Sequence, residues 1–299
     1  MVTVLTPTYN RANTLCKLYS SLLQQTSFDF EWLIIDDGST DDTEYLVKEF
    51  KSNKFPINYI KKKNGGKHTA LNYSHQYING ETVIIVDSDD HLTTDAIKTI
   101  NKDWYKFKKD LSIAVLSYQR KNEVGEILSE KSEEPYKIDD DINYRVNNNI
   151  KGDRCEVVRS SVFISYKFPE FENEKFIGEG WLWTNIARKF KTVYINEAIY
   201  NCEYLHGGLT KSGRLFRMNN SLGMMENCKV YFESPVRKKV RLKEFVLYGM
   251  YMLCSKKKMT NSLRDSSHPW AIVAVFPFSC ALYLFWKNKY GFIKSNKDE

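Results

Sequence analysis

The sequence predicts an α/β fold built on a mixed, mainly parallel sheet that lies between helices. Three short apolar segments rich in β-branched residues, 2–5, 32–35 and 82–86, are typical of buried strands. Helix-forming segments separate these strands, and that alternation favours parallel strands joined by right-handed connections. The second and third strands run directly into acidic turns at 36–42 and 87–90. Because open α/β sheets bind ligands at the carboxyl ends of their strands, we expect a polar site at that edge.

Composition sets broad limits on the function. The chain has 299 residues, of which 42% are hydrophobic, and this is enough for a large core. The net charge of +7 suggests an anionic partner such as a nucleotide or a phospholipid, although scattered lysines supply much of the excess. The six cysteines lack zinc-ligand spacing, so free thiols in a reducing cytoplasm are expected. The chain opens directly on a strand pattern, so we expect no signal peptide.

Two helices are predicted to follow the first two strands. Leucines recur at helical spacing over 14–25, directly after the first strand. After the second strand, Gly38 relaxes the turn, and residues 39–42 offer N-caps for a helix that runs to about residue 50. The first half of the chain therefore follows the strand–helix alternation that a parallel sheet requires.

A third strand at 57–60 leads into a basic turn at 61–72. Gly65 and Gly66 free backbone amides next to Lys67 at the start of a helix, and together these groups favour a phosphate-binding cradle. The alternative is a solvated basic loop. No G-x-G-x-x-G pattern follows the first strand and no P-loop pattern is present, so dinucleotide oxidoreduction fits poorly.

The acidic turn after the strand at 82–86 carries three carboxylates, Asp87, Asp89 and Asp90. Carboxylates this close repel one another unless a cation lies between them. A divalent cation that holds a phosphate fits, because hard oxygen ligands suit Mg²⁺ and Mn²⁺. The alternative is a turn that caps the following helix, and for Asp90 we expect that capping role.

Four sequence blocks resemble those of a known family. They are Val4-Leu5-Thr6-Pro7-Thr8-Tyr9-Asn10-Arg11, Leu33-Ile34-Ile35-Asp36-Asp37-Gly38-Ser39-Thr40-Asp41, Asn64-Gly65-Gly66-Lys67 and Val86-Asp87-Ser88-Asp89-Asp90. Their order and spacing resemble the family 2 glycosyltransferases of GT-A fold, of the bacterial surface-polysaccharide type. The resemblance covers about the first hundred residues, and it implies a GT-A glycosyltransferase domain over 1–215.

The resemblance implies roles for residues in these blocks. Tyr9 would stack on the nucleobase, and Asp37 would accept the imide N–H of uracil, which favours uridine over cytidine. Lys67 would approach the diphosphate or the ribose, and Asp87 the sugar hydroxyls. Asp89 would bind the metal that bridges the two phosphates, Mn²⁺ or Mg²⁺. The donor-binding residues implied are Thr6, Pro7, Thr8, Tyr9, Arg11, Asp37, Lys67, Asp87 and Ser88, while Asp36 would only cap its turn.

An inverting transfer also needs a base to deprotonate the acceptor hydroxyl. The family commonly places a Glu-Asp pair before an aromatic-rich helix, whereas here Gly180 follows Glu179. Glu179 is therefore the candidate base, with Glu174 in reserve. The alternative for Glu179 is that an acid at a helix N-terminus is favoured in any case. Trp181 is a candidate for stacking on the acceptor sugar.

The second half of the chain gives weaker signals. We expect strands at 113–118 and 193–195 and an irregular, charged insertion at 119–150. His206 is a candidate for a late metal or phosphate contact, although a loop histidine is often merely exposed. Arg214 is a further candidate for neutralising a diphosphate.

Residues 216–299 are expected to form a helical, basic and apolar extension. An uncharged run at 270–286 is bracketed by tryptophans, falls short of the about 20 residues that span a bilayer, and is predicted to break at Pro277. Insertion into one face of a membrane is favoured over spanning, and neighbouring lysine clusters suit anionic lipid. The alternative is a buried helix or a contact between copies in a homo-oligomer.

Together these features predict a metal-dependent, inverting glycosyltransferase. It would move a sugar from a UDP-sugar to a hydroxyl of a lipid-linked or growing surface polysaccharide, such as a capsule carried on a polyprenyl diphosphate. We expect it in the cytoplasm, peripheral on the inner face of the cell membrane, with no nucleic-acid partner. Two alternatives remain. One is a sugar nucleotidyltransferase, and the other is a non-catalytic or weakly active membrane-bound scaffold, which is considered because the Glu-Asp pair is missing.

Overall fold

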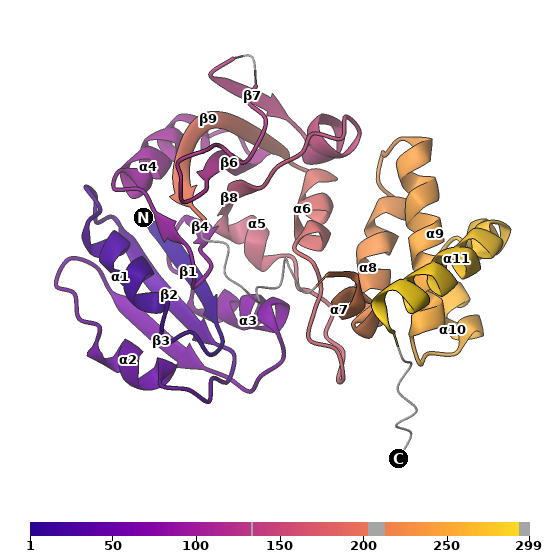
Figure 1. Cartoon of the computed structure of the whole chain (residues 1–299). Coiled ribbons are helices and arrows are strands. Elements are labelled where there is room, and N and C mark those ends of the chain that lie inside the picture. The colour runs from indigo at the N-terminus through magenta and orange to yellow at the C-terminus, as the bar shows by residue number, and fades with distance from the viewer. Residues whose placement is uncertain (133, 203–212, 293–299) are drawn as a thin grey trace. The chain divides into compact units, whose positions relative to one another are not determined.

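Residues 1–132, 134–202 and 213–292 are described by the structure, a computed structural model. The chain divides into two compact units (Figure 1). The first contains Met1–Lys167 and Ile186–Leu205, and the second contains Phe168–Asn185 and His206–Glu299.

A nine-stranded sheet forms the first unit, in the order β3-β2-β1-β4-β8-β6-β9-β5, with β7 paired to β9. The four strands β3, β2, β1 and β4 are parallel to one another, as predicted for the strands that lead to the acidic turns. β8 is antiparallel to β4 and β6, so the whole sheet is mixed. The strands are β1 (Val2–Thr8), β2 (Phe30–Asp36), β3 (Ile57–Lys61), β4 (Thr82–Ile85), β5 (His91–Leu92), β6 (Ile113–Lys121), β7 (Tyr136–Asp139), β8 (Arg154–Arg159) and β9 (Lys191–Asn201).

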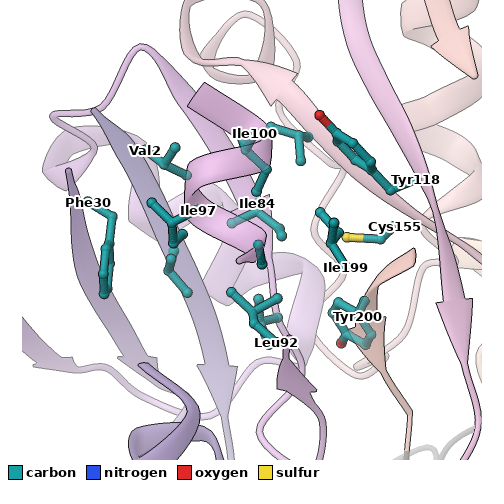
Figure 2. Close-up of a cluster of buried hydrophobic side chains, with 14 of the residues drawn as sticks. Val2, Phe30, Ile84, Leu92, Ile97, Ile100, Tyr118, Cys155, Ile199 and Tyr200 are labelled. Atoms are coloured by element: carbon teal, nitrogen blue, oxygen red, sulfur yellow. The ribbon is translucent and has the colours of Figure 1, made fainter. Parts of the chain in front are cut away.

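The core of the first unit lies where helices cover this sheet. Ile97 and Ile100 of α4 belong to one buried cluster with Ile84 of β4 and Ile199 of β9 (Figure 2). These two isoleucines are three positions apart and therefore share one face of the helix. The helical elements of the unit are α1 (Leu15–Leu23), α2 (Thr43–Glu49), α3 (Lys67–Ser74), η1 (His75–Tyr77), α4 (Ala96–Phe107), the π-helical turn η2 (Ile142–Val146) and α5 (Ser160–Ile164).

The predicted irregular insertion at 119–150 is more ordered than expected. β6 continues to Lys121, β7 pairs with β9, and the turn η2 follows. The adjacent strand β8 was not predicted from the sequence, and it carries a buried arginine, Arg154. The guanidinium of Arg154 donates to the carbonyl oxygens of Ser117 and Ile195 at 2.7 and 2.8 Å. A charged side chain that bonds inside the sheet interrupts the hydrophobic pattern on which strand prediction depends.

The second unit is helical. It contains most of α6 (Gly180–Ala187), then α7 (Gly213–Asn219), α8 (Ser221–Phe232), α9 (Lys238–Cys254), α10 (Met259–Arg264) and α11 (Pro269–Tyr290). α9 and α11 lie side by side (Figure 1). A Cβ atom at Gly249 of α9 would lie 2.4 Å from the hydroxyl oxygen of Ser279 on α11, so only glycine permits this approach. That hydroxyl donates to the carbonyl oxygen of Val246 at 3.0 Å and ties the two helices together.

Helix α11 runs unbroken through Pro277, so the predicted break is wrong. Proline removes one N–H donor from a helix and leaves the carbonyl four residues earlier without its usual partner. Here Pro277 and Val273 are both exposed, so this part of the helix is not enclosed by protein. The helix spans 22 residues, which by length and composition is enough to cross a membrane.

Candidate functional site

The carboxyl ends of β1, β2 and β4 meet at one edge of the sheet. Thr8 at the end of β1 lies opposite Asp36 at the end of β2, and Leu5 lies opposite Ile85. The register places residues 9–11, the turn after Asp36 and residues 87–90 beside one another. We call residues 87–90 the acid turn.

Asp37 holds the glycine loop that follows β3. Its carboxylate is buried and accepts hydrogen bonds from the backbone N–H groups of Gly65 and Gly66, at 2.9 and 2.6 Å. The ammonium of Lys62 lies 2.7 Å from the same carboxylate. The two amides predicted as a phosphate cradle therefore bind Asp37 instead. Since a carboxylate has about four acceptor positions, Asp37 keeps capacity for one further donor.

Asp36 supports the turn after β2, as the sequence predicted. Its carboxylate accepts the backbone N–H of Ser39 at 2.7 Å and the hydroxyl of Tyr59. Gly38, in the same turn, has φ of +80°, and a Cβ there would lie 2.8 Å from the backbone nitrogen of Asn64. The turn therefore needs glycine at this position both for its backbone conformation and for space.

Lys67 and Asp87, which the sequence linked only by resemblance, form an ion pair. Lys67 is the first residue of α3, and its ammonium donates to the Asp87 carboxylate. Burial alone would raise the pKa of Asp87, but Lys67, Arg120 and Arg11 together hold that pKa below its ordinary value. Asp87 is thus maintained as an anion at the centre of the site.

Asp89 is compensated less completely, although Arg11 and Lys67 also act to lower its pKa. Burial and the neighbouring charge of Asp87 raise the pKa of Asp89, and within the described residues Lys67 pairs with Asp87 instead. A carboxylate in this state gains most from a cation that arrives with a ligand. No cluster of three or more His, Cys, Asp or Glu side chains that could hold a metal occurs in the described residues. One or two carboxylates of the acid turn, completed by substrate phosphates, are a donor set of the kind that suits an Mg²⁺-like ion.

Asp90 does not cap a helix, so that prediction is wrong. The chain continues into the short strand β5, and the N-cap of α4 is Asp95. The Asp90 carboxylate accepts the hydroxyl of Tyr200 at 2.8 Å. Burial and the charge of Asp87 raise the pKa of Asp90 to about 7.

Sequence reasoning missed two residues of this site, Tyr200 and Arg120. The hydroxyl of Tyr200 also accepts the backbone N–H of Asp87 at 3.0 Å. The guanidinium carbon of Arg120 lies 4.4 Å from the centre of the Tyr200 ring. Arg120 lies near the carboxyl end of β6, and Tyr200 lies near the carboxyl end of β9. That position is the one signal that could have indicated these residues.

The remaining predicted donor residues differ in their surroundings. Tyr9 is 45% exposed and Thr8 is buried, while the Thr6 hydroxyl accepts the indole N–H of Trp32 at 3.0 Å inside the core. The Thr6 side chain thus supports the site from behind. Arg11 lies close enough to lower the pKa of Asp87. Pro7 and Ser88 are both buried at the sheet edge.

Glu179 and Trp181 belong to the second unit. The carbonyl oxygen of Glu179 accepts the N–H groups of Leu182 and Trp183 at 2.9 and 3.2 Å, so Glu179 stands at the N-terminus of α6. Trp181 packs on Phe168, with ring centres 5.0 Å apart. The predicted metal contact His206 lies outside the described residues.

Two other charged residues of the second unit have structural partners. The guanidinium of Arg214 lies 4.4 Å from the ring centre of Trp286. The Glu174 carboxylate accepts the backbone N–H groups of Leu222 and Gly223 at 2.8 and 2.9 Å, and so it caps α8. Capping of α8 explains why an acid stands at position 174. Glu174, the reserve candidate for the base, therefore needs no catalytic role.

Replacing Glu174 with alanine should therefore lower stability and leave chemistry intact. Loss of a helix cap costs about 0.5–2 kcal/mol, so we expect a lower free energy of unfolding by urea denaturation. Activity per folded molecule should stay within about twofold, since 0.4 kcal/mol corresponds to that factor. Glu172→Ala is the matched control, because Glu172 is exposed. A large loss of activity in folded E174A would restore Glu174 as a candidate base.

The chain is similar to known proteins over more than half of its length. Residues 3–166, more than half of the chain, match the model of the family described as Glycosyl transferase family 2. Glycosyltransferase GlyA of Streptococcus pneumoniae is 30% identical over 226 residues, which are 70% of this chain and 31% of GlyA. Chondroitin synthase of Escherichia coli is 34% identical over 122 residues, which are 41% of this chain and 17% of the synthase. The chain thus spans less than a third of the length of these relatives.

Solved structures resemble the fold over nearly the whole chain. Residues 1–349 of S. aureus TarS, in complex with UDP-GlcNAc, align with a TM-score of 0.66 and 18% identity, covering 98% of this chain and 93% of that one. The mannosyltransferase PcManGT from Pyrobaculum calidifontis, in complex with GDP-Man and Mn²⁺, aligns with a TM-score of 0.56 and 16% identity, covering 97% and 84%. At these identities the likeness establishes a shared GT-A-like fold.

Proposed function

The chain belongs to glycosyl transferase family 2, and from that premise we propose that it moves a sugar from a UDP-sugar to a hydroxyl of a lipid-linked or growing surface polysaccharide. The observation that carries the proposal is the acid turn, paired with Lys67 at the edge where β1 and β2 also end. The complex of TarS with UDP-GlcNAc supports the donor class, and the relative named chondroitin synthase supports a polysaccharide product. In this proposal residues 1–215 carry out the transfer and residues 216–299 contact the membrane.

Uridine recognition falls to Tyr9 and Asp37. Tyr9 follows β1 as an exposed ring, and such a ring can stack on a base. Asp37 holds three donors of its own chain and keeps one acceptor position for the imide N–H of uracil. Cytosine lacks that N–H, so the same position disfavours cytidine. Thr8, Arg11 and Ser88 complete the donor surface in this proposal.

A divalent cation, Mn²⁺ or Mg²⁺, would neutralise the diphosphate and stabilise it as a leaving group when bound. Asp89 is the residue we assign to hold it, because Asp87 is already paired with Lys67. PcManGT was solved with Mn²⁺, which supports a divalent ion in this fold. The chain itself supplies Lys67, whose ammonium keeps Asp87 ionised and oriented.

Glu179 is the base in this proposal. It takes the proton from the acceptor hydroxyl while the acceptor oxygen forms a bond to the anomeric carbon. The bond from that carbon to the phosphate oxygen breaks, and UDP leaves with the electron pair. Attack from the face opposite the leaving group inverts the configuration of the sugar. Trp181, two residues after Glu179 in sequence, offers an aromatic face for the acceptor.

A panel of UDP-sugars, incubated with the full chain and Mn²⁺, tests the proposal through release of UDP. We expect one donor to give metal-dependent UDP release that an acceptor glycan accelerates. Formation of pyrophosphate from UTP and a sugar phosphate would instead identify a nucleotidyltransferase. Binding of UDP with Mn²⁺ but no turnover with any donor or acceptor would identify a non-catalytic scaffold.

Membrane association is the second part of the proposal, and α11 supports it. One side of α11 packs on α9, while Trp270, Phe278 and Phe285 on the helix are 84, 68 and 56% exposed. These three residues are separated by eight and seven positions, so they share one face. The ammonium of Lys289 lies 5.5 Å from the centre of the Phe285 ring. Because one side is packed on protein, insertion in the plane of the inner leaflet fits better than spanning.

The net positive charge is concentrated in the C-terminal part of the chain, whereas composition alone suggested scattered lysines. Residues 213–292 contain 14 lysines and arginines against four aspartates and glutamates, a net charge of +10. Residues 1–212 contain 28 against 31, a net charge of −3. The segment that contains the apolar face of α11 therefore also carries charge that attracts anionic lipid, at about 1 kcal/mol for each cation near the surface.

Introducing two acids into the exposed face of α11 should release the protein from membranes. For Phe278→Glu with Phe285→Glu we expect at least about a tenfold loss of binding to vesicles of phosphatidylglycerol and phosphatidylcholine, measured by cosedimentation. Leu111→Glu, an exposed apolar residue of the first unit, is the matched control and should bind normally. If the double variant changes a dimer into a monomer in light scattering and leaves vesicle binding unaltered, α11 is a protein interface instead.

A further inference from the structure

One buried hydroxyl, that of Tyr200, spans both ends of the acid turn. It accepts the backbone N–H of Asp87 at 3.0 Å and donates to the carboxylate of Asp90 at 2.8 Å. Tyr200 is fully buried and comes from β9, more than a hundred residues farther along the chain. A backbone hydrogen bond of 3.0 Å from Asp90 N–H to the Asp87 carbonyl closes the turn between these two points. The conformation of the turn is therefore fixed both by its own backbone hydrogen bond and by the two hydrogen bonds of the Tyr200 hydroxyl.

Arg120 fixes the ring of Tyr200 in turn. The two residues are Cα partners in the parallel pair of β6 and β9. The Arg120 guanidinium lies over the Tyr200 ring at 4.4 Å, which is a favourable cation–π distance. The positive charge of Arg120 also opposes the mutual repulsion of the carboxylates, because it helps to hold the pKa of Asp87 below its ordinary value.

This arrangement addresses a problem that the acid turn creates. Asp87, Asp89 and Asp90 lie within four residues, and their charges favour a conformation that separates them. A metal ligand is useful only if its oxygen is held where the ion and the phosphates meet, and partners of the ligands usually provide that constraint. Tyr200 holds the residues on either side of Ser88 and Asp89, and so it limits where the Asp89 carboxylate can point.

We propose that Tyr200 is a positioning residue that holds the acid turn so that Asp89 can bind a divalent cation together with the donor diphosphate, and that Arg120 keeps the Tyr200 ring in place. The inference rests on the proposed function, since it assumes a nucleotide diphosphate as ligand. β6 and β9 thereby contribute to the site, although neither strand belongs to any of the four sequence blocks.

The same strand supplies a matched control. Tyr194 of β9 is also buried, donates its hydroxyl to Asp141 at 2.9 Å, and has an arginine, Arg154, 5.5 Å from its ring. Tyr194→Phe removes a tyrosine–aspartate hydrogen bond of the same kind without a contact to the acid turn. A purely structural role of Tyr200 predicts the same result for both variants.

The test compares Tyr200→Phe, Tyr194→Phe and Arg120→Lys in the full chain. Binding of Mn²⁺ in the presence of saturating UDP is measured by electron paramagnetic resonance, and thermal unfolding is measured in parallel. We expect Y200F to weaken Mn²⁺ binding about 10- to 100-fold, the range found for partners of metal ligands, while Y194F binds as the wild type does. R120K keeps the charge but loses the planar group, so we expect a smaller loss of about threefold to tenfold.

The outcomes separate the inference from the proposed function. If Y200F binds Mn²⁺ with UDP as tightly as the wild type, or if Y194F weakens binding equally, the positioning role is overturned while the proposed function stands. If the wild-type chain binds no UDP in the presence of Mn²⁺, the proposed function fails and the inference fails with it. Melting temperatures that fall alike in Y200F and Y194F, together with a loss of Mn²⁺ binding in Y200F alone, would support positioning.

Discussion

Replacing Asp89 with asparagine should lower the kcat/KM of sugar transfer by about 100- to 1,000-fold, because a metal contributes several kcal/mol of charge stabilisation at the leaving group. Asparagine keeps the size of the side chain but removes the negative charge that would attract the ion. In the structure no other carboxylate of the turn can replace it directly, since Asp87 pairs with Lys67 and Asp90 with Tyr200. The measurement is the initial rate of UDP release over a range of Mn²⁺ concentrations.

A matched variant makes this result specific. Asp42→Asn removes an exposed carboxylate from the N-terminus of α2, where its side chain forms no capping hydrogen bond. We expect D42N to keep the rate and the Mn²⁺ dependence of the wild type. If D89N were to retain full Mn²⁺-dependent transfer, the metal assignment to Asp89 would be wrong, and Asp87 would become the next candidate.

Replacing Glu179 with glutamine should lower kcat by about 100- to 10,000-fold, the usual contribution of a general base. Glutamine occupies the same volume but cannot take a proton from the acceptor hydroxyl. Binding of UDP and Mn²⁺ should remain unchanged, because those contacts are assigned to residues of the first unit. The measurement combines the rate of glycan formation with calorimetric binding of UDP in the presence of Mn²⁺.

The alternative for Glu179 is a favourable acid at the N-terminus of α6, worth about 0.3–1 kcal/mol in stability. That role predicts a modest drop in the melting temperature of E179Q and no loss of rate. Glu172→Gln, an exposed acid seven residues earlier, provides the control for charge removal in the same segment. Full transfer activity in a normally folded E179Q would falsify the base assignment.

Much of the fold followed from local patterns. The apolar strands that become β1, β2 and β4, the leucine stripe of α1 and the role of Asp36 in its turn were all expected, and the structure confirms them. Hydrophobic periodicity and turn chemistry are properties of neighbouring residues, so a sequence expresses them directly. β8 was missed because its pattern contains a buried arginine whose hydrogen-bond partners, on Ser117, Ser129 and Ile195, lie more than 20 residues away in the sequence.

The sequence alone determined the family, the sheet edge that carries the proposed site and most of the residue types found there. The tertiary structure decided the partners: Asp37 binds the amides of a loop 28 residues away, and Glu174 caps a helix nearly 50 residues later. It also decided that Asp90 meets Tyr200 across 110 residues, where a helix cap was expected. A side chain takes the partner that folding brings within about 3 Å, and separation along the chain carries no information about that distance.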